Sequence, residues 1–204
     1  MADIGTFCID QVQGSPVTWV DAVITCTANG KRLCTDAEWV TACNATGKGL
    51  QTMTGNYEWV AELVSATSAK KRGYTDCTSA SNHDVTSGGY EVRCCYTPNL
   101  VPTGMADFTT FRIDQTEGPL QTWVAAASSC MVSGKRLCLD TEWTTACAAT
   151  GKGMQTMTGA WEWIAKLASA TTAKKRGDVD CSSLSASSVT EVLDSHDTRC
   201  CHTP

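Results

Sequence analysis

Apolar residues recur at helical spacing in the first part of the chain. Across residues 18–28, Trp19, Val23 and Cys26 fall on one face of a helix, and Gly30 follows as a C-terminal cap. The next stretch opens with Thr-Asp-Ala-Glu, in which Thr35 and Glu38 have the spacing of a capping box. The pattern therefore predicts two short helices, over residues 18–28 and from residue 35 onward.

Short strands are expected on either side of these helices. Residues 7–10 (FCID) precede a turn at Gly14, and a last strand ends in Cys94 and Cys95. Between them lie a glycine-rich segment and a divergent loop, residues 78–93.

The pattern occurs twice. GKRLCTDAEWVTAC, which starts at Gly30, returns as GKRLCLDTEWTTAC from Gly134, and residues 6–77 match residues 110–181 at most positions. The period is too long for a solenoid repeat and suits an independently folded small domain. We therefore expect two tandem domains, residues 1–96 and 105–204, joined by residues 97–104, whose two prolines make a short, fairly stiff linker.

The second copy predicts matching elements with one change in helix capping. A strand is expected over residues 111–114 and a first helix over residues 122–132. Leu139 replaces the capping threonine of the second helix, and we expect Asp140 to take over part of the capping.

Composition and charge limit the class of protein. With 42% hydrophobic and 18% charged residues, the chain of 204 residues reads as soluble and globular. The net charge is −5, and the basic residues form short clusters such as residues 70–72, best interpreted as a solvated turn. These features argue against a nucleic-acid partner, and no apolar run reaches the about 18 residues of a membrane span.

Thirteen cysteines, without a C-x-x-C pair, favour disulfides over zinc and imply an oxidising location. Six cysteines per repeat suffice for three disulfides. Cys8 is left over, because Arg112 holds the matching position. It is either a free buried thiol or an intermolecular thiol that links copies into a homo-oligomer, and both alternatives stay open.

The N-terminal sequence does not provide the secretory signal that an oxidising location would require. MADIGTFCID has neither the basic nor the apolar region of a secretory signal, and its first three residues recur from Met105. This recurrence favours Met1 as a natural start without a signal peptide.

The two repeats diverge most in residues 78–93 and 182–199, which differ in sequence and length. A fixed scaffold with one drifting loop is typical of a recognition surface, although unconstrained loop drift gives the same pattern. The candidate exposed binding residues are Asn82, His83, Asp84, Tyr90, Ser187, Glu191, Asp194 and His196.

Four motifs occur in a fixed order: GKRLCTDAEW, GNYEW, KKRG and GYEVRCC. Their order resembles that of the formylglycine-generating enzyme (sulfatase-modifying factor) family. The resemblance implies an α+β, C-type-lectin-like fold in two minimal tandem copies. It also implies a disulfide from the GKRL helix to the last strand, Cys43–Cys94 and Cys147–Cys200. The remaining cysteines of each repeat allow three pairings, namely those among Cys26, Cys34, Cys77 and Cys95, and among Cys130, Cys138, Cys181 and Cys201.

The resemblance does not carry its chemistry to this chain. Family enzymes bind copper through a cysteine pair, whereas Cys77 stands alone in the corresponding segment and is expected in a structural disulfide. Iron-binding relatives use several histidines, and only three occur here, His83, His196 and His202. The family's calcium motif is one residue short around Glu58, so buried structural tryptophans are preferred there. We expect no catalytic residues, metal or cofactor.

These observations predict a non-enzymatic structural or binding protein. Many cysteines without a signal peptide fit a particle that is assembled in the cytoplasm and oxidised after release. The expected location is therefore a virion surface or the extracellular space, as a capsid decoration protein or tail adhesin of a bacteriophage. Expected partners are other virion or surface proteins and a host-cell glycan or protein. The alternatives are a thiol-modifying copper oxidase and a secreted bacterial surface or filament protein.

Overall fold

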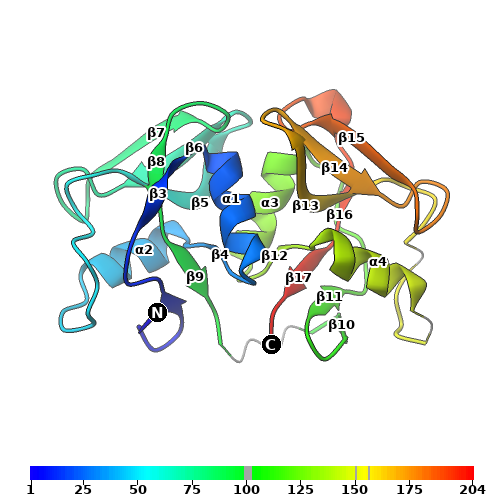
Figure 1. Cartoon of the computed structure of the whole chain (residues 1–204), viewed down its shortest axis with the longest axis horizontal. Coiled ribbons are helices and arrows are strands. Elements are labelled where there is room, and N and C mark those ends of the chain that lie inside the picture. The colour runs from blue at the N-terminus through cyan, green and yellow to red at the C-terminus, as the bar shows by residue number, and fades with distance from the viewer. Residues whose placement is uncertain (99–102, 150, 156) are drawn as a thin grey trace. The chain divides into compact units, whose positions relative to one another are not determined.

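The computed structural model describes residues 1–98, 103–149, 151–155 and 157–204, which fold with mixed α and β structure (Figure 1). The chain forms two compact units, Met1–Pro98 and Asn99–Pro204. Part of the expected linker, residues 99–102, lies outside the described residues, so its stiffness stays a prediction. Over the described ranges, no helix has the length and apolar content of a membrane span.

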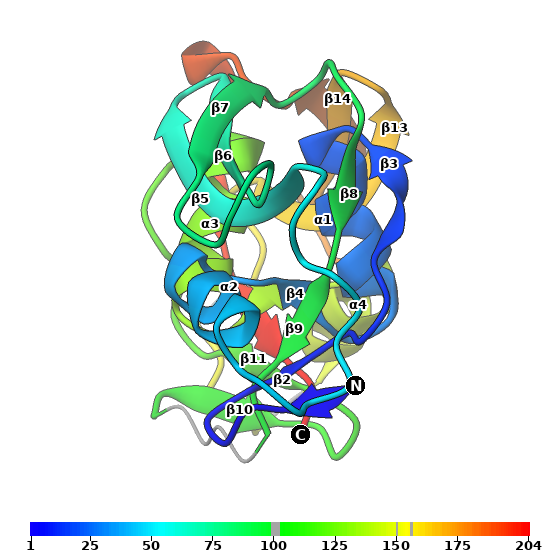
Figure 2. The same ribbon diagram turned by 90° about the vertical axis from the view of Figure 1, so that its left-hand side faces the viewer.

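The first unit contains two sheets and two helices. Its elements are β1 (Ala2–Asp3), β2 (Cys8–Ile9), β3 (Gly14–Val17), α1 (Trp19–Ala28), β4 (Arg32–Leu33), α2 (Asp36–Cys43), β5 (Glu58–Ser65), β6 (Ser68–Arg72), β7 (Ala80–Asp84), β8 (Tyr90–Val92) and β9 (Cys94–Tyr96). The smaller sheet has the order β1-β2-β9-β4 and the larger one β3-β8-β5-β6-β7. Figure 2 shows the larger sheet above, with α2 below it beside β4 and β9.

The second unit repeats this plan. Its elements are β10 (Met105–Asp107), β11 (Arg112–Asp114), α3 (Trp123–Val132), β12 (Arg136–Leu137), α4 (Asp140–Ala148), β13 (Glu162–Ser169), β14 (Thr172–Arg176), β15 (Leu184–Ser188), the 3-10 helix η1 (Val192–Asp194), β16 (Asp197–Thr198) and β17 (Cys200–His202). Its sheets have the orders β10-β11-β17-β12 and β15-β14-β13-β16. The divergent segments therefore hold strands and are not simple loops, contrary to expectation.

The predicted helix starts are confirmed in the first unit. Thr18 accepts a hydrogen bond from the Asp21 amide at the start of α1. In α2 the Thr35 hydroxyl accepts from the Glu38 amide at 3.2 Å, and the Glu38 carboxylate accepts from the Thr35 amide at 2.9 Å. Each helix thus begins where a local side chain satisfies its first backbone amides.

The expected capping role of Asp140 is wrong. Glu142 accepts a hydrogen bond from the Leu139 amide at 2.9 Å, but the leucine side chain has no oxygen to return one. The Asp140 carboxylate instead accepts hydrogen bonds from Arg176 and Lys166. Helix α4 therefore starts with half of a capping box, because Leu139 lacks a hydroxyl and Asp140 is paired with these cations.

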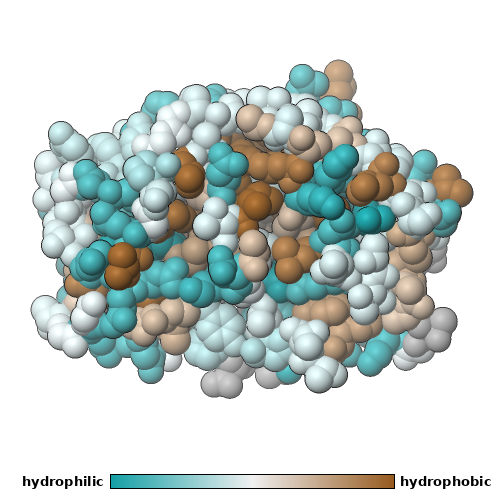
Figure 3. Space-filling model, in the orientation of Figure 1, coloured by the Kyte–Doolittle hydropathy of each residue, from teal (hydrophilic) through white to brown (hydrophobic). Residues whose placement is uncertain are grey.

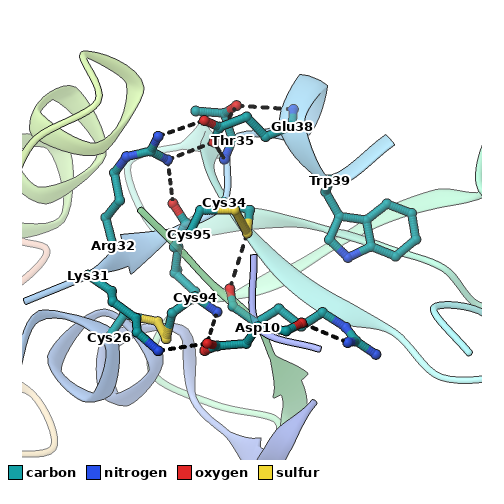
Figure 4. The surroundings of a disulfide bond; sticks show 12 residues. Asp10, Cys26, Lys31, Arg32, Cys34, Thr35, Glu38, Trp39, Cys94 and Cys95 are labelled. Atoms are coloured by element: carbon teal, nitrogen blue, oxygen red, sulfur yellow. Dashed lines mark hydrogen bonds and ion pairs between the residues drawn. A yellow bond between two sulfur atoms is a disulfide. The ribbon is translucent and has the colours of Figure 1, made fainter. Parts of the chain in front are cut away.

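Three disulfides cross-link each unit. They are Cys26–Cys94, Cys34–Cys95 and Cys43–Cys77 in the first, and Cys130–Cys200, Cys138–Cys201 and Cys147–Cys181 in the second. Figure 4 shows the first two side by side around β9. The expected pairs Cys43–Cys94 and Cys147–Cys200 are wrong, whereas the structural disulfide expected for Cys77 is confirmed.

Strand geometry explains the correction. Side chains of consecutive strand residues point to opposite faces, so Cys94 and Cys95 cannot face the same partner. Cys94 bonds to α1 through Cys26, and Cys95 bonds to Cys34 after β4. Cys43, at the end of α2, is left to the segment after β6, where Cys77 lies at a Cα–Cα distance of 5.7 Å.

A buried ion pair lies where β8 passes into β9. Arg93 and Glu58 are 0% and 1% exposed, and the guanidinium Nε lies 2.9 Å from Glu58 Oε1. Arg93 also donates to the carbonyls of Asp10 and Gln11, at 3.0 and 2.7 Å. The indole of Trp39 donates to the second Glu58 oxygen at 2.8 Å. The ion pair thus joins α2, β5 and the chain after β2.

The second unit has the same arrangement. Arg199 Nε lies 3.0 Å from Glu162 Oε1, and the Trp143 indole donates to Glu162 at 2.8 Å. Three tryptophans per unit are fully buried, namely Trp19, Trp39, Trp59, Trp123, Trp143 and Trp163. On the face drawn in Figure 3, hydrophilic and hydrophobic side chains alternate in small groups.

The disulfide pattern gives a direct test. Cleavage before Asp36 separates Cys34 from Cys43, so non-reducing peptide mapping by mass spectrometry distinguishes the pairings. We expect the Cys43 peptide to be joined to the Cys77 peptide and not to the Cys94 peptide. The Cys43→Ser/Cys77→Ser double variant should lose about 3 kcal/mol of unfolding free energy. A Cys43–Cys94 peptide would contradict the fold.

The difference in capping gives a matched pair of variants. Leu139→Thr should complete the capping box of α4 and raise its local stability by about 1 kcal/mol, whereas Thr35→Leu should lower that of α2 by a similar amount. Native-state hydrogen exchange of the amides of each helix, in the full chain, measures both. If both variants raised, or both lowered, the stability of their helices, the capping roles assigned to residues 35 and 139 would be contradicted.

Candidate functional site

The two lysines of β6, Lys70 and Lys71, point to opposite faces of the sheet, and Lys71 points into the first unit. Lys71 is 5% exposed, and its Nζ lies 3.6 Å from the ring centroid of Tyr90 and 4.3 Å from that of Tyr57. These are cation–π distances. The expectation of a solvated turn at residues 70–72 is therefore wrong, because the segment is a strand whose middle residue points inward.

The two neighbours of Lys71 turn toward α2. Lys70 and Arg72 form ion pairs with Asp36 at 2.8 and 2.6 Å. Burial opposes ionisation of Asp36, but the hydrogen bonds and charges of Arg72 and Lys70 outweigh it and hold the pKa of Asp36 below its ordinary value. The basic cluster thus fixes the sheet to the helix and is not an open basic surface.

Aromatic rings gather around Lys71. The rings of Tyr57 and Tyr74 stack with centroids 5.1 Å apart, and Tyr90 meets Tyr57 edge-on at 6.0 Å. Trp59 and His83 also meet Tyr90 edge-on, at 5.0 and 5.3 Å. Tyr90 is therefore the centre of an aromatic cluster that draws on β5, β7 and β8.

A pocket of about 400 Å³ opens beside this cluster. Its lining residues are Pro16, Asn56, Tyr57, Tyr74, Gly89, Tyr90 and Glu91. We refer to these seven residues as the tyrosine pocket. Asn56 Nδ2 donates to Glu91 Oε1 at 2.8 Å. The other oxygen, Glu91 Oε2, is shielded from solvent and has no hydrogen-bond partner within the described part of the chain.

The turn before β8 keeps this arrangement compact. Gly88 has a φ of +72°, and a Cβ on it would lie 2.9 Å from the His83 ring. Only glycine combines this backbone conformation with such close approach. His83 therefore packs beneath the turn that delivers Tyr90 to the pocket.

The structure brings together only some of the residues predicted from the sequence. His83 and Tyr90 both belong to the aromatic cluster. Asn82 Nδ2 reaches Ser68 Oγ at 3.4 Å instead. Asp84 closes the turn after β7, where hydrogen bonds from Thr86 hold its pKa below the ordinary value.

Several pocket residues were missed, because they lie outside the divergent segments. Tyr57 and Tyr74 lie in well-matched parts of the repeat, yet the second copy has Trp161 and Asp178 in their places, and Ala160 in place of Asn56. Isolated differences of chemical class within matching segments were the available signal.

The second unit builds a different cluster around the matching lysine. Lys175 Nζ lies 2.7 Å from His196 Nε2 and 5.2 Å from the ring centroid of Trp161. His196 holds the place of Tyr90, because it bridges Gln121 where Tyr90 pairs with Val17. Its ring also meets Trp163 edge-on at 4.8 Å.

Of the other candidates in the second unit, only Asp194 lies close enough to act on this cluster, where its charge opposes the lowering of the pKa of His196. Ser187 on β15 pairs with Ala173 on β14, and Glu191 precedes η1. Asp194 accepts a hydrogen bond from the Ser188 amide at 3.1 Å. Of the four sequence candidates, only His196 contacts the lysine.

Cysteine and carboxylate groups are already engaged. Cys77 and Cys181 are held in disulfides, and Glu58 is held by Arg93 and Trp39. Among the cysteines of the described chain, Cys8 alone is outside a disulfide, half-buried on β2. No grouping of three or more metal-ligating side chains occurs within the described residues.

Comparison with known proteins gives no family: no protein-family model matches the chain, and no curated protein matches it. The resemblance to the formylglycine-generating enzymes therefore stays a prediction based on four motifs.

The His196 cluster predicts a pH dependence confined to the second unit. Burial and then the charge of Lys175 lower the pKa of His196 from the ordinary value of 6.5, so the folded state favours the neutral imidazole. The native state binds fewer protons than the unfolded state, and stability should fall as the pH drops below 6.5. Hydrogen exchange of the β14 and β16 amides measures this loss.

His196→Tyr supplies the control, because it introduces the residue found at this place in the first unit. Its β14 and β16 amides should lose less protection over the same pH range. An unchanged slope in this variant would contradict the role of His196.

Proposed function

We propose that this chain is a non-enzymatic binding protein, in which two disulfide-stapled domains present different recognition surfaces on one repeated frame. The observation that carries the proposal is the contrast between the buried frame and the aromatic cluster. The three disulfides and the buried arginine, glutamate and tryptophan recur at matching places in both units. The groups around the β6 and β14 lysines differ.

The differences change the chemistry and leave the frame intact. Tyr90 corresponds to His196, and Tyr74 corresponds to Asp178. Each substitution alters charge, hydrogen bonding or stacking at the surface, while the disulfides below it keep the same connectivity. Divergence of this kind favours recognition over unconstrained drift, because it affects residues that line one pocket.

The proposed setting is outside the reducing cytoplasm. Six disulfides within the described chain support an extracellular or particle-surface location, because such cross-links persist in oxidising surroundings. Our proposal for that surface is a bacteriophage virion, with a capsid decoration protein or tail adhesin as the role. The partners we propose are a host-cell glycan or protein and other surface proteins.

The finer fold assignment is part of the same proposal. Two helices with two small sheets per unit support a C-type-lectin-like domain of the formylglycine-generating type, and the four motifs carry that resemblance. The Cys43–Cys77 disulfide weighs against the copper-oxidase alternative, because it uses Cys77 as a structural cross-link.

Selection from two unbiased libraries tests the proposal. The oxidised full chain is immobilised and exposed to a glycan array and to a phage-displayed random peptide library. We expect at least one library to yield a ligand that the Pro16→Leu/Asn56→Ala/Tyr74→Asp variant binds at least about tenfold more weakly. These substitutions introduce the residues of the second unit, so the frame should tolerate them.

The matched control is Leu193→Ser, which changes a side chain that is 98% exposed in the second unit. It should leave binding unchanged. Failure of both libraries to yield a ligand that depends on the tyrosine pocket would contradict the proposed function.

A further inference from the structure

We propose that the tyrosine pocket of the first unit is a saccharide site that accepts an uncharged pyranose ring. This inference rests on the proposed binding function and names the class of ligand.

The pocket offers a flat apolar surface to solvent. Tyr57 and Tyr74 stack with an interplanar angle of 20°, and Tyr74 is 57% exposed. Two stacked rings make a platform that is held in place without burying its outer face. The C–H face of a pyranose packs on such a platform, and a volume of about 400 Å³ suits a ligand of one or two rings.

The polar groups beside the platform suit hydroxyl groups. Glu91 Oε2 is shielded from solvent, so the carboxylate oxygen that faces the pocket beside Asn56 is Oε1, which accepts from Asn56 Nδ2 at 2.8 Å. Asn56 uses one amide hydrogen for Glu91 Oε1, which leaves its second hydrogen and its carbonyl oxygen for other partners. A hydroxyl both donates and accepts, so neighbouring sugar hydroxyls can donate to the second lone pair of Glu91 Oε1 and exchange hydrogen bonds with Asn56.

Charge excludes the other ligands that aromatic pockets bind. A cationic ligand would be repelled by the ammonium of Lys71, which lies over the rings of Tyr57 and Tyr90. An anionic ligand would meet the Glu91 carboxylate. An uncharged ligand with hydroxyl donors avoids both conflicts.

The second unit lacks the parts that this recognition needs. Asp178 replaces the exposed platform ring of Tyr74, and Ala160 replaces the amide of Asn56. We therefore expect one saccharide site per chain, located in the first unit.

The test uses the oxidised full chain on a glycan array of neutral hexosides, N-acetylhexosaminides and sialylated glycans, with tetramethylammonium titrated separately. We expect a neutral glycan to bind. In saturation-transfer NMR, its ring C–H protons on one face should receive the strongest transfer. Tyr74→Ala and Glu91→Gln should each weaken binding at least about tenfold, whereas Leu193→Ser should not.

Three results would overturn the saccharide proposal: no neutral glycan binds, only sialylated glycans or tetramethylammonium bind, or binding of the neutral glycan survives Tyr74→Ala. The peptide library separates the two proposals. A pocket-dependent peptide without any glycan refutes the saccharide site but keeps the binding function, whereas no pocket-dependent ligand of either kind refutes both.

Discussion

The buried ion pair between Arg93 and Glu58 is the interaction on which the rest of each unit depends. Burial raises the pKa of Glu58, and the Arg93 charge opposes that rise, so the Glu58 carboxylate depends on Arg93 to stay ionised. Removing one partner of such a pair costs about 3–5 kcal/mol, because the other charge is left buried. The chain carries the same pair as Arg199 and Glu162, and both are as deeply buried.

The position of Arg93 explains how so small a unit holds two sheets. It lies between β8 of the larger sheet and β9 of the smaller one, and the next two residues are Cys94 and Cys95. Three consecutive residues, Arg93 and the first two residues of β9, therefore carry the ion pair and two of the three disulfides. The register that the pair favours also sets Glu91 opposite Glu58 on β5, which brings Glu91 to the tyrosine pocket. Stability and the candidate site thus depend on the same few residues.

Local features were predictable from the sequence, and features that join distant segments were not. The α1 and α2 starts followed from apolar spacing and capping, which act within one turn. The partner of Cys43 could not be read from local sequence, because it depends on the face to which Cys94 points. The family resemblance predicted Cys43–Cys94, whereas the structure has Cys43–Cys77. Lys71 looked solvated as part of a charge run, but strand alternation buries it. Of the tyrosine pocket, Tyr90 was predicted, whereas Tyr57 and Tyr74 were missed because they come from separate segments that match between the repeats.

Lys71 of β6 connects the buried part of the first unit to the tyrosine pocket. Lys71 occupies the inner faces of Tyr57 and Tyr90, so the aromatic surface left for a ligand is the outward one formed with Tyr74. Lys175 holds the same strand position but contacts His196, an imidazole that titrates near neutral pH when unperturbed. One buried cation thus lies beneath a tyrosine-lined pocket in the first unit and within a proton-sensitive cluster in the second. The two domains share one fold, and substitution of the residues around the shared lysine position is sufficient to make their surface chemistry differ.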